Sequence, residues 1–193
     1  MSTAGFPLSH RLRRGLAAAV LAAWALHAWA MTTEFSFAIM LWSCHVATLA
    51  IAAGLLGGWL LPVAAGTVFH IGAGIPSWLV ETLVSGRWFP TSVAVHTLPA
   101  AVGVLCFRRR GRLPRGTLTA AWSLDLGMVP VSRWTTAPEW NVNLAHETWK
   151  PLEPFFPSLF AFHVAAALAT LASLGAVSGL LNRLLARRAA RLP

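Results

Sequence analysis

The stretch that decides the fold is residues 37–56, which read FAIMLWSCHVATLAIAAGLL. It carries no full charge, and it holds the adjacent side chains Cys44 and His45. About 20 apolar residues at a rise of 1.5 Å each span a hydrocarbon core roughly 30 Å thick. We therefore expect a membrane-spanning helix here. Because an ionisable group at that depth is costly, Cys44 should face a partner or a cavity inside a helix bundle.

The composition of the whole chain is that of an integral membrane protein. Hydrophobic residues make up 56% of its 193 residues and charged residues only 11%, against about 25% in soluble domains. The net charge of +9 comes from short basic clusters beside apolar runs, a pattern that indicates topology rather than nucleic-acid binding. The two cysteines, Cys44 and Cys106, both lie in apolar runs and do not form a disulfide framework.

The apolar runs predict a single all-α domain, residues 1–193, built as a bundle of six transmembrane helices. The predicted spans cover about residues 15–31, 37–56, 59–80, 91–107, 116–134 and 158–181. The first run also fits a cleavable signal peptide ending at Ala28-Trp29-Ala30, although we favour a retained span. Pro76 is expected to break or kink the third helix. The fifth run is the least apolar, because it contains Asp125 and Pro130.

The basic residues predict the orientation of this bundle. With both termini cytoplasmic, the arginine clusters at 11–14, 108–115 and 183–191 all fall on the inner side. Only Arg87, Arg133 and Lys150 fall outside. This asymmetry follows the positive-inside rule. We therefore expect a multi-pass protein of the inner (plasma) membrane.

Each predicted span carries one titratable group between its outer end and the bilayer midplane. In chain order these groups are His27, Cys44, His70, His96, Asp125 and His163. The inner halves of the spans carry almost none. Ionisable side chains at a shared depth are expected to line one cavity that opens toward the outer side.

Within this layer, Cys44 and His96 are the predicted catalytic pair. A thiol is a weak nucleophile until a base takes its proton, and a histidine on a facing helix is a suitable base. Thr48 lies one turn from Cys44 and is expected to hydrogen-bond within the site. His45 points roughly 100° away from Cys44 and is expected to bond a neighbouring helix instead. A thiol–imidazole pair inside a bilayer suits attack on a lipid ester through a thioester intermediate.

The other polar groups of the layer are candidates for binding substrate or supporting the pair. His70 and His163 are placed in this class, each with a structural interhelical hydrogen bond as the alternative. Asp125 either orients a histidine or faces the outer water. Cys106, beside an arginine cluster, is expected to be inert.

Four short stretches resemble a known family. They are Cys44 within LWSCHVATLA, the run FHIGAGIPSWL, the run FPTSVAVH that ends at His96, and Asn143 shortly before Lys150-Pro151. Together they resemble the YwaF-like integral membrane proteins. That family is similar to transmembrane ether-phospholipid acyltransferases and, more distantly, to the androgen-induced six-span fatty-acid-ester hydrolases. The resemblance implies Cys44 as nucleophile, His96 as base and Asn143 as polar support.

The leading hypothesis is therefore an enzyme of lipid acyl transfer or fatty-acyl ester hydrolysis. It requires no cofactor and no metal, its partners are membrane lipids including an acyl-lipid substrate, and it leaves the oligomeric state open. One alternative is a haem- or metal-binding membrane protein, with facing histidines such as His70 and His163 as ligands. Another is a small transporter or a non-catalytic membrane subunit, with the polar layer as a path for substrate or protons.

Overall fold

The computed structural model describes residues 6–108 and 110–191, and every regular element in these two ranges is helical. The helices are α1 (His10–Glu34), α2 (Ser43–Gly57), α3 (Leu60–Phe69), α4 (Ile75–Ser85), α5 (Pro90–Phe107), α6 (Thr117–Thr135) and α7 (Leu159–Ala189). Short 3₁₀ turns cover Phe37–Leu41, Pro138–Trp140, Val142–Leu144 and Lys150–Phe155. A π-helical turn, His70–Gly74, joins α3 to α4. The predicted all-α class is confirmed.

Four helices are long and apolar enough to cross a membrane. They are α1, the continuous helix Leu60–Ser85 formed by α3, the π turn and α4, then α5, and α7. Helix α2 is apolar but has only 15 residues. Helix α6 has 19 residues, but its sequence includes Asp125 and Arg133 and is less apolar than the four. The chain therefore has the helical character of a membrane protein.

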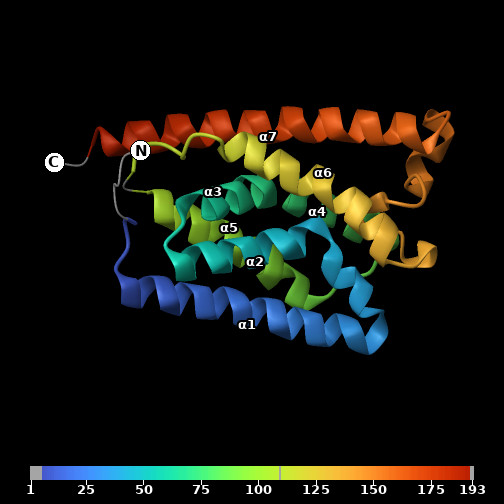
Figure 1. The fold of residues 1–193 in the computed structure, drawn as a ribbon, viewed down its shortest axis with the longest axis horizontal. Coiled ribbons are helices and arrows are strands. Elements are labelled where there is room, and N and C mark those ends of the chain that lie inside the picture. Colours follow the sequence, from blue (N-terminus) through green and yellow to red (C-terminus); the bar gives the residue numbers. More distant parts are fainter. Residues whose placement is uncertain (1–5, 109, 192–193) are drawn as a thin grey trace.

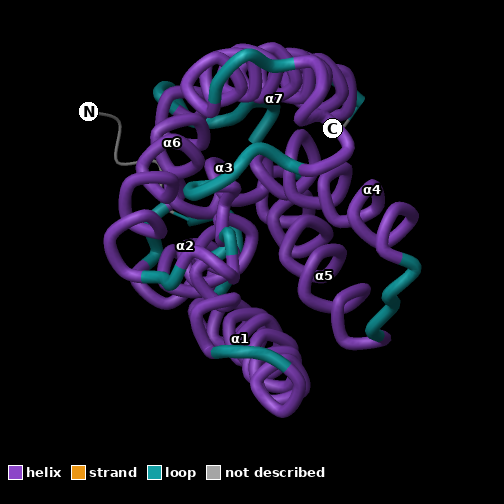
Figure 2. The backbone as a smooth tube through the Cα atoms, turned by 90° about the vertical axis from the view of Figure 1, so that its right-hand side faces the viewer, coloured by secondary structure: helices purple, strands orange, loops and turns teal. Residues whose placement is uncertain are grey.

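The helix Leu60–Ser85 lies at the centre of the bundle. Seen end-on, α3 sits in the middle, with α7 and α6 on one side and α1 on the other (Figure 2). In agreement, 56% of its apolar window is buried, against 11% for α7. Side chains of its first part, α3, are therefore well enclosed, whereas α4 lies at the edge of the bundle and has no buried residue.

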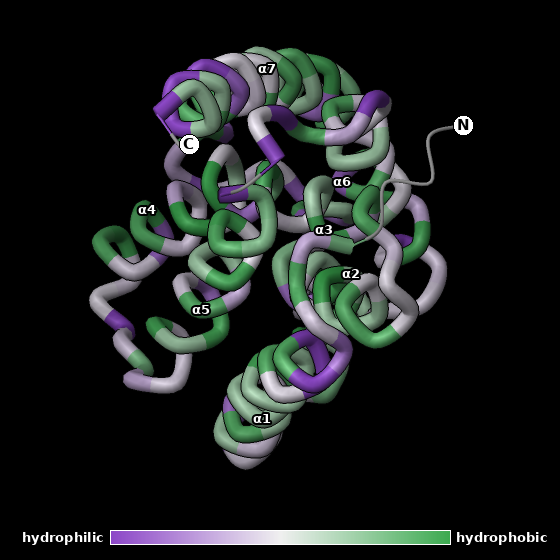
Figure 3. Tube along the Cα trace, turned by 90° about the vertical axis from the view of Figure 1, so that its left-hand side faces the viewer, coloured by the Kyte–Doolittle hydropathy of each residue, from purple (hydrophilic) through white to green (hydrophobic). Residues whose placement is uncertain are grey.

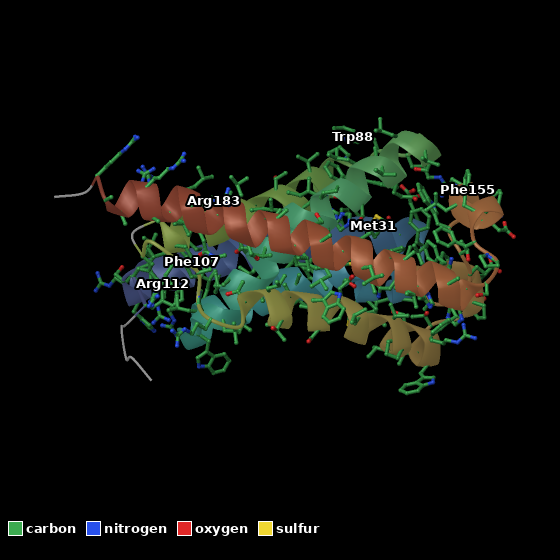
Figure 4. The ribbon with its side chains drawn as sticks, turned by 90° about the horizontal axis from the view of Figure 1, so that it is seen from above. Met31, Trp88, Phe107, Arg112, Phe155 and Arg183 are labelled. Carbon is green, nitrogen blue, oxygen red and sulfur yellow. The ribbon has the colours of Figure 1, made fainter. Side chains whose placement is uncertain are left out.

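The two ends of the bundle differ in character. Helix α1 begins and α7 ends at the same end, on the left of Figure 1. That end is rich in hydrophilic positions, notably along the last turns of α7 (Figure 3). Arg112 and Arg183 lie toward it, whereas Trp88 and Phe155 lie toward the opposite end (Figure 4). The latter two are 59% and 75% exposed, as expected for side chains at a membrane–water interface.

The prediction of one continuous helix over residues 37–56 is wrong at its start. Residues 37–41 form a separate 3₁₀ turn, Trp42 has an extended ψ of 139°, and α2 begins at Ser43. The cause is Asn143, whose Oδ1 accepts the backbone N–H of Ser43 at 2.8 Å. Its Nδ2 donates to the carbonyl oxygen of Leu41 at 2.8 Å. The loop between α6 and α7 therefore takes backbone groups that a continuous helix would bond internally.

The expected break at Pro76 is replaced by a π turn, and the helix continues to Ser85. Pro76 has no N–H, so the carbonyl oxygen of Gly72, four residues earlier, loses its helical donor. Ser173 on α7 supplies one, because its Oγ lies 2.5 Å from that oxygen. The helix thus continues beyond Pro76, and the carbonyl oxygen of Gly72 has a hydrogen-bond donor.

Glycines allow the central helices to approach closely, as the spacing of Gly66 and Gly74 predicts. A Cβ on Gly66 would lie 2.8 Å from the carbonyl oxygen of Ala47, so the backbones of α2 and α3 are in contact. A Cβ on Gly103 of α5 would lie only 1.6 Å from Oγ1 of Thr67. Small residues at helix contacts are typical of membrane bundles, because they let backbones pack tightly.

Candidate functional site

Four histidines from different parts of the chain meet inside the bundle. His27 on α1, His45 on α2, His70 at the start of the π turn and His96 on α5 are 2%, 3%, 0% and 4% exposed. Ring centroids lie 5.1 Å apart for His27 and His45, and 6.2 Å apart for His45 and His96. The centroids of His96 and His70 are also 6.2 Å apart. We call these four residues the histidine cluster.

Hydrogen bonds orient the rings on the α5 side of the cluster. Nδ1 of His27 lies 2.9 Å from Oγ1 of Thr91. Nδ1 of His96 donates to the carbonyl oxygen of Ser92 at 2.8 Å. A neutral imidazole carries one proton, so this bond leaves Nε2 of His96 as an acceptor. The His96 ring also stacks on Trp78, with centroids 5.1 Å apart and an interplanar angle of 13°.

On the α2 side, Thr48 connects the histidine cluster to the helix that carries Cys44. Oγ1 of Thr48 lies 3.0 Å from Nε2 of His70, 2.9 Å from the carbonyl oxygen of Cys44 and 3.4 Å from that of Val95. Nδ1 of His70 is buried without a hydrogen-bond partner, and so is Nδ1 of His45. Buried polar atoms without partners are uncommon and call for an explanation.

Cys44 lies in the first turn of α2 and is half buried. A Cβ built on Gly74 would lie 3.5 Å from Cβ of Cys44 and 3.3 Å from Nδ1 of His70. The thiol therefore stands across Gly74 from an unpartnered ring nitrogen. Within residues 6–108 and 110–191, no hydrogen bond joins the Cys44 sulfur to a histidine ring. The catalytic pairing of Cys44 with His96 stays a prediction.

Asp125 and Asn143 both lie at the start of α2. The carboxyl group of Asp125, on α6, lies against the side chains of Ser43 and Thr170. Asn143 accepts from the N–H and the hydroxyl of Ser43 and donates to Oγ of Ser132 at 2.7 Å. These contacts hold the turn that carries the thiol.

His163 lies apart from the histidine cluster. Its Nε2 donates to the carbonyl oxygen of Leu144 at 2.8 Å. Leu144 and Asn143 both have a φ of +54°, a conformation that side chains other than glycine adopt with strain. His163 thus fastens a strained loop to α7, which is the structural alternative given for it above.

Sequence reasoning left His45 outside the site, and the structure places it in the centre of the histidine cluster. It points away from Cys44, as helical geometry requires, but that direction leads between His27 and His96. His27 and His96 share a predicted depth, so depth alone was a usable signal for the cluster. Trp78, which stacks on His96, carried no such signal.

The structure offers no support for a metal site. Among the described residues, no group of three or more His, Cys, Asp or Glu side chains is arranged to hold a metal ion.

Two hollows lie at the end of the bundle where α1 begins and α7 ends. The first is lined by Pro7, Leu8, Ser9, Leu12, Leu105, Cys106, Arg108 and Arg188, and the second by Leu184, Arg187, Arg188 and Arg191. Neither is lined by a histidine, so the outward-opening cavity stays a prediction.

Fold and site together define a class: an all-helical protein with four helices of membrane-spanning length and a buried histidine cluster beside a cysteine. Comparison of the chain with protein-family models, with curated proteins and with solved structures finds no match. A function must therefore be argued from the site itself.

Proposed function

We propose that the chain is a membrane enzyme that transfers fatty acyl groups between lipids or hydrolyses acyl-lipid esters, with Cys44 as its nucleophile. One observation carries the proposal: inside a bundle of membrane-type helices, a half-buried cysteine lies across Gly74 from His70, one of four clustered and buried histidines. Histidine is the side chain best suited to accept and return a proton near neutral pH. The likeness of four short stretches to the YwaF-like family gives further support.

The chemistry is a double displacement at the acyl carbon. An imidazole accepts the thiol proton and the sulfur attacks the ester carbonyl carbon. The C–S bond forms, the ester C–O bond breaks, and the imidazolium gives its proton to the leaving alcohol. A second hydroxyl then attacks the thioester, passes its proton through the imidazole to the sulfur, and takes the acyl group. Transfer and hydrolysis differ only in whether that hydroxyl belongs to a lipid or to water.

The remaining residues of the predicted site have supporting roles in this proposal. His96 is the base that the family resemblance implies, and its Nε2 is free to accept a proton. Asn143 holds the start of α2, on which Cys44 is carried. Asp125 lies against Ser43, the first residue of the same helix, and so supports the same turn.

The proposal includes a six-span topology in the inner (plasma) membrane, with both termini cytoplasmic. In this topology α2 and α6 cross the membrane as well, in addition to the four longer helices. Arginines of the first turns of α1 and the last turns of α7 fall at the end that Figure 3 shows as hydrophilic, which supports this orientation. Reporter fusions after Ser85 and after Ala189 test it: activity of a cytoplasmic reporter is expected only at the second position.

Trapping the acyl-enzyme tests the function. The purified protein is incubated in vesicles with phospholipid that carries an alkyne-tagged acyl chain, and the mass of the peptide containing Cys44 is measured. We expect a hydroxylamine-sensitive adduct on Cys44 that is lost in Cys44→Ala and retained in the matched control Cys106→Ala. Lipid turnover that is the same in wild type and Cys44→Ala, with no adduct on the thiol, would overturn the proposal.

A further inference from the structure

His70 is the most enclosed member of the histidine cluster and sits at a structural irregularity. It is fully buried and is the first residue of the π turn His70–Gly74. Single π turns inside α-helices are rare and are often found at functional sites. The turn here carries the sequence HIGAG, in which Ile71 is the only bulky apolar side chain. Phe69, just before the turn, meets the imidazole edge-on, with ring centroids 6.3 Å apart.

Thr48 fixes which nitrogen of His70 holds the proton. The Thr48 hydroxyl has one hydrogen, and the carbonyl oxygens of Cys44 and Val95, at 2.9 Å and 3.4 Å, can only accept it. Its oxygen is then free to accept from Nε2–H of His70 at 3.0 Å. A neutral imidazole carries one proton, so Nδ1 of His70 is left with a lone pair and no partner.

That lone pair belongs to a nitrogen on the Cys44 side of the ring, where Gly74 lies between them. The position of a Cβ on Gly74 is 3.3 Å from Nδ1 of His70 and 3.5 Å from Cβ of Cys44. The sulfur is carried one bond beyond that Cβ. Glycine at residue 74 leaves the space between them open, and any larger residue would enter it. An unpartnered, buried acceptor and the Cβ of a half-buried cysteine thus lie on either side of one glycine.

We propose that Cys44, His70 and Thr48 form one catalytic unit, in which His70, in place of the His96 that the family resemblance implies, is the base for the thiol and Thr48 is its positioning residue. Nδ1 of His70 accepts the proton from the sulfur, and Nε2–H stays bonded to Thr48. For the acyl chemistry this inference rests on the proposed function, and the same Nδ1 returns the proton to the leaving alcohol. The proton transfer itself is a property of the chain without substrate.

His96 is differently placed. Its Nδ1 is bonded within its own helix, and its ring contacts Trp78, His45 and His70. Within the described residues, no hydrogen bond joins His96 to the Cys44 side chain. His70, by contrast, meets Cys44 through both Thr48 and Gly74. The titratable groups facing the unit are His96 on α5, His45 on α2 and Asp125 on α6.

The test is the rate at which Cys44 is alkylated, measured against pH with iodoacetamide on the full chain in detergent micelles. All variants carry Cys106→Ala, so that intact mass reports on one thiol. We expect His70→Gln to slow alkylation near neutral pH by about tenfold or more and to leave the rate in alkali unchanged, because only the thiolate reacts. His96→Gln should slow the reaction less than His70→Gln does. Ser178→Ala, which removes a buried hydroxyl of α7 outside the site, is the control and should keep a neutral-pH rate within about twofold of the parent.

Substitutions of Thr48 provide a second pair of variants, which tests the same inference if His70→Gln fails to fold. Thr48→Val removes the acceptor for Nε2–H and should slow the neutral-pH reaction, whereas Thr48→Ser should restore it. A slow neutral-pH rate in His96→Gln with a normal rate in His70→Gln would overturn the inference, and so would equal profiles in all variants. If the variants alter alkylation as expected but no acyl adduct forms on Cys44, the proposed function is wrong and the proton transfer from Cys44 to His70 is still supported.

Discussion

Oγ of Ser173 lies 2.5 Å from the carbonyl oxygen of Gly72, joining α7 to the π turn that carries His70. This oxygen is the one that Pro76 cannot satisfy, because proline has no N–H. The contact therefore links α7, the least buried of the four long helices, to the helix Leu60–Ser85, the most buried one, close to His70. Removing it should weaken the packing of both helices.

Ser173→Ala is expected to destabilise the protein by about 1–3 kcal/mol, because it leaves a buried carbonyl oxygen without a donor. The free energy of unfolding, measured by SDS titration in mixed micelles, checks this. Ser178→Ala on the same helix is the matched control, since Oγ of Ser178 is buried without a partner. Its removal should cost nothing, and equal effects of the two substitutions would contradict the assignment.

Asn143→Ala should destabilise the start of α2. It removes the bonds to Leu41 and Ser43 and places an alanine at a φ of +54°, so we expect a loss of about 2–4 kcal/mol. The comparison is Asn141→Ala, which also has a positive φ, of 39°, but bonds only to His146 and Glu147 in its own loop. Only the first substitution should also alter the alkylation rate of Cys44. If Asn141→Ala alters it equally, the loop as a whole holds the thiol.

Hydropathy and charge were sufficient to predict most of the helices. The predicted run 91–107 matches α5 to within one residue, and α1 contains the run 15–31. Helix α7 covers the run 158–181 except its first residue and continues for two more turns at its polar end. The start of α2 was not predictable in the same way, because Asn143 determines it from 100 residues away in sequence. No local pattern in residues 37–43 records that contact.

The depth of the histidines along their helices could be predicted from the sequence, but the direction in which their side chains face could not. Counting residues from the span ends places His27, His70 and His96 at similar depths, and they do share one cluster with His45. The same count includes His163, which instead bonds the loop carbonyl of Leu144. Which way a side chain faces depends on how each helix is rotated in the bundle, and apolar runs with weak periodicity do not fix that rotation.

Gly103→Ala tests the close contact between α3 and α5. The new methyl group would lie 1.6 Å from Oγ1 of Thr67, a side chain whose hydroxyl is bonded to Val63 at 2.6 Å. The helices would have to separate, so we expect a loss of about 3 kcal/mol in the free energy of unfolding. Gly127→Ala, inside α6 with open space around it, should instead be neutral or stabilising by up to about 1 kcal/mol. A tolerated Gly103→Ala would mean that the two helices are less tightly packed than described.

Gly74→Ala separates the chemistry of Cys44 from the stability of the bundle. The added methyl group would sit 3.3 Å from Nδ1 of His70 and 3.5 Å from Cβ of Cys44, between base and thiol. These are tight contacts but not severe clashes, so the free energy of unfolding should fall by only about 1 kcal/mol. The neutral-pH alkylation rate should fall by about tenfold, because the proton can no longer pass directly from sulfur to nitrogen. Gly175→Ala, with open space at the site of substitution, should leave that rate unchanged. If alkylation persists in Gly74→Ala at the parent rate, the thiol gives its proton to a group other than His70.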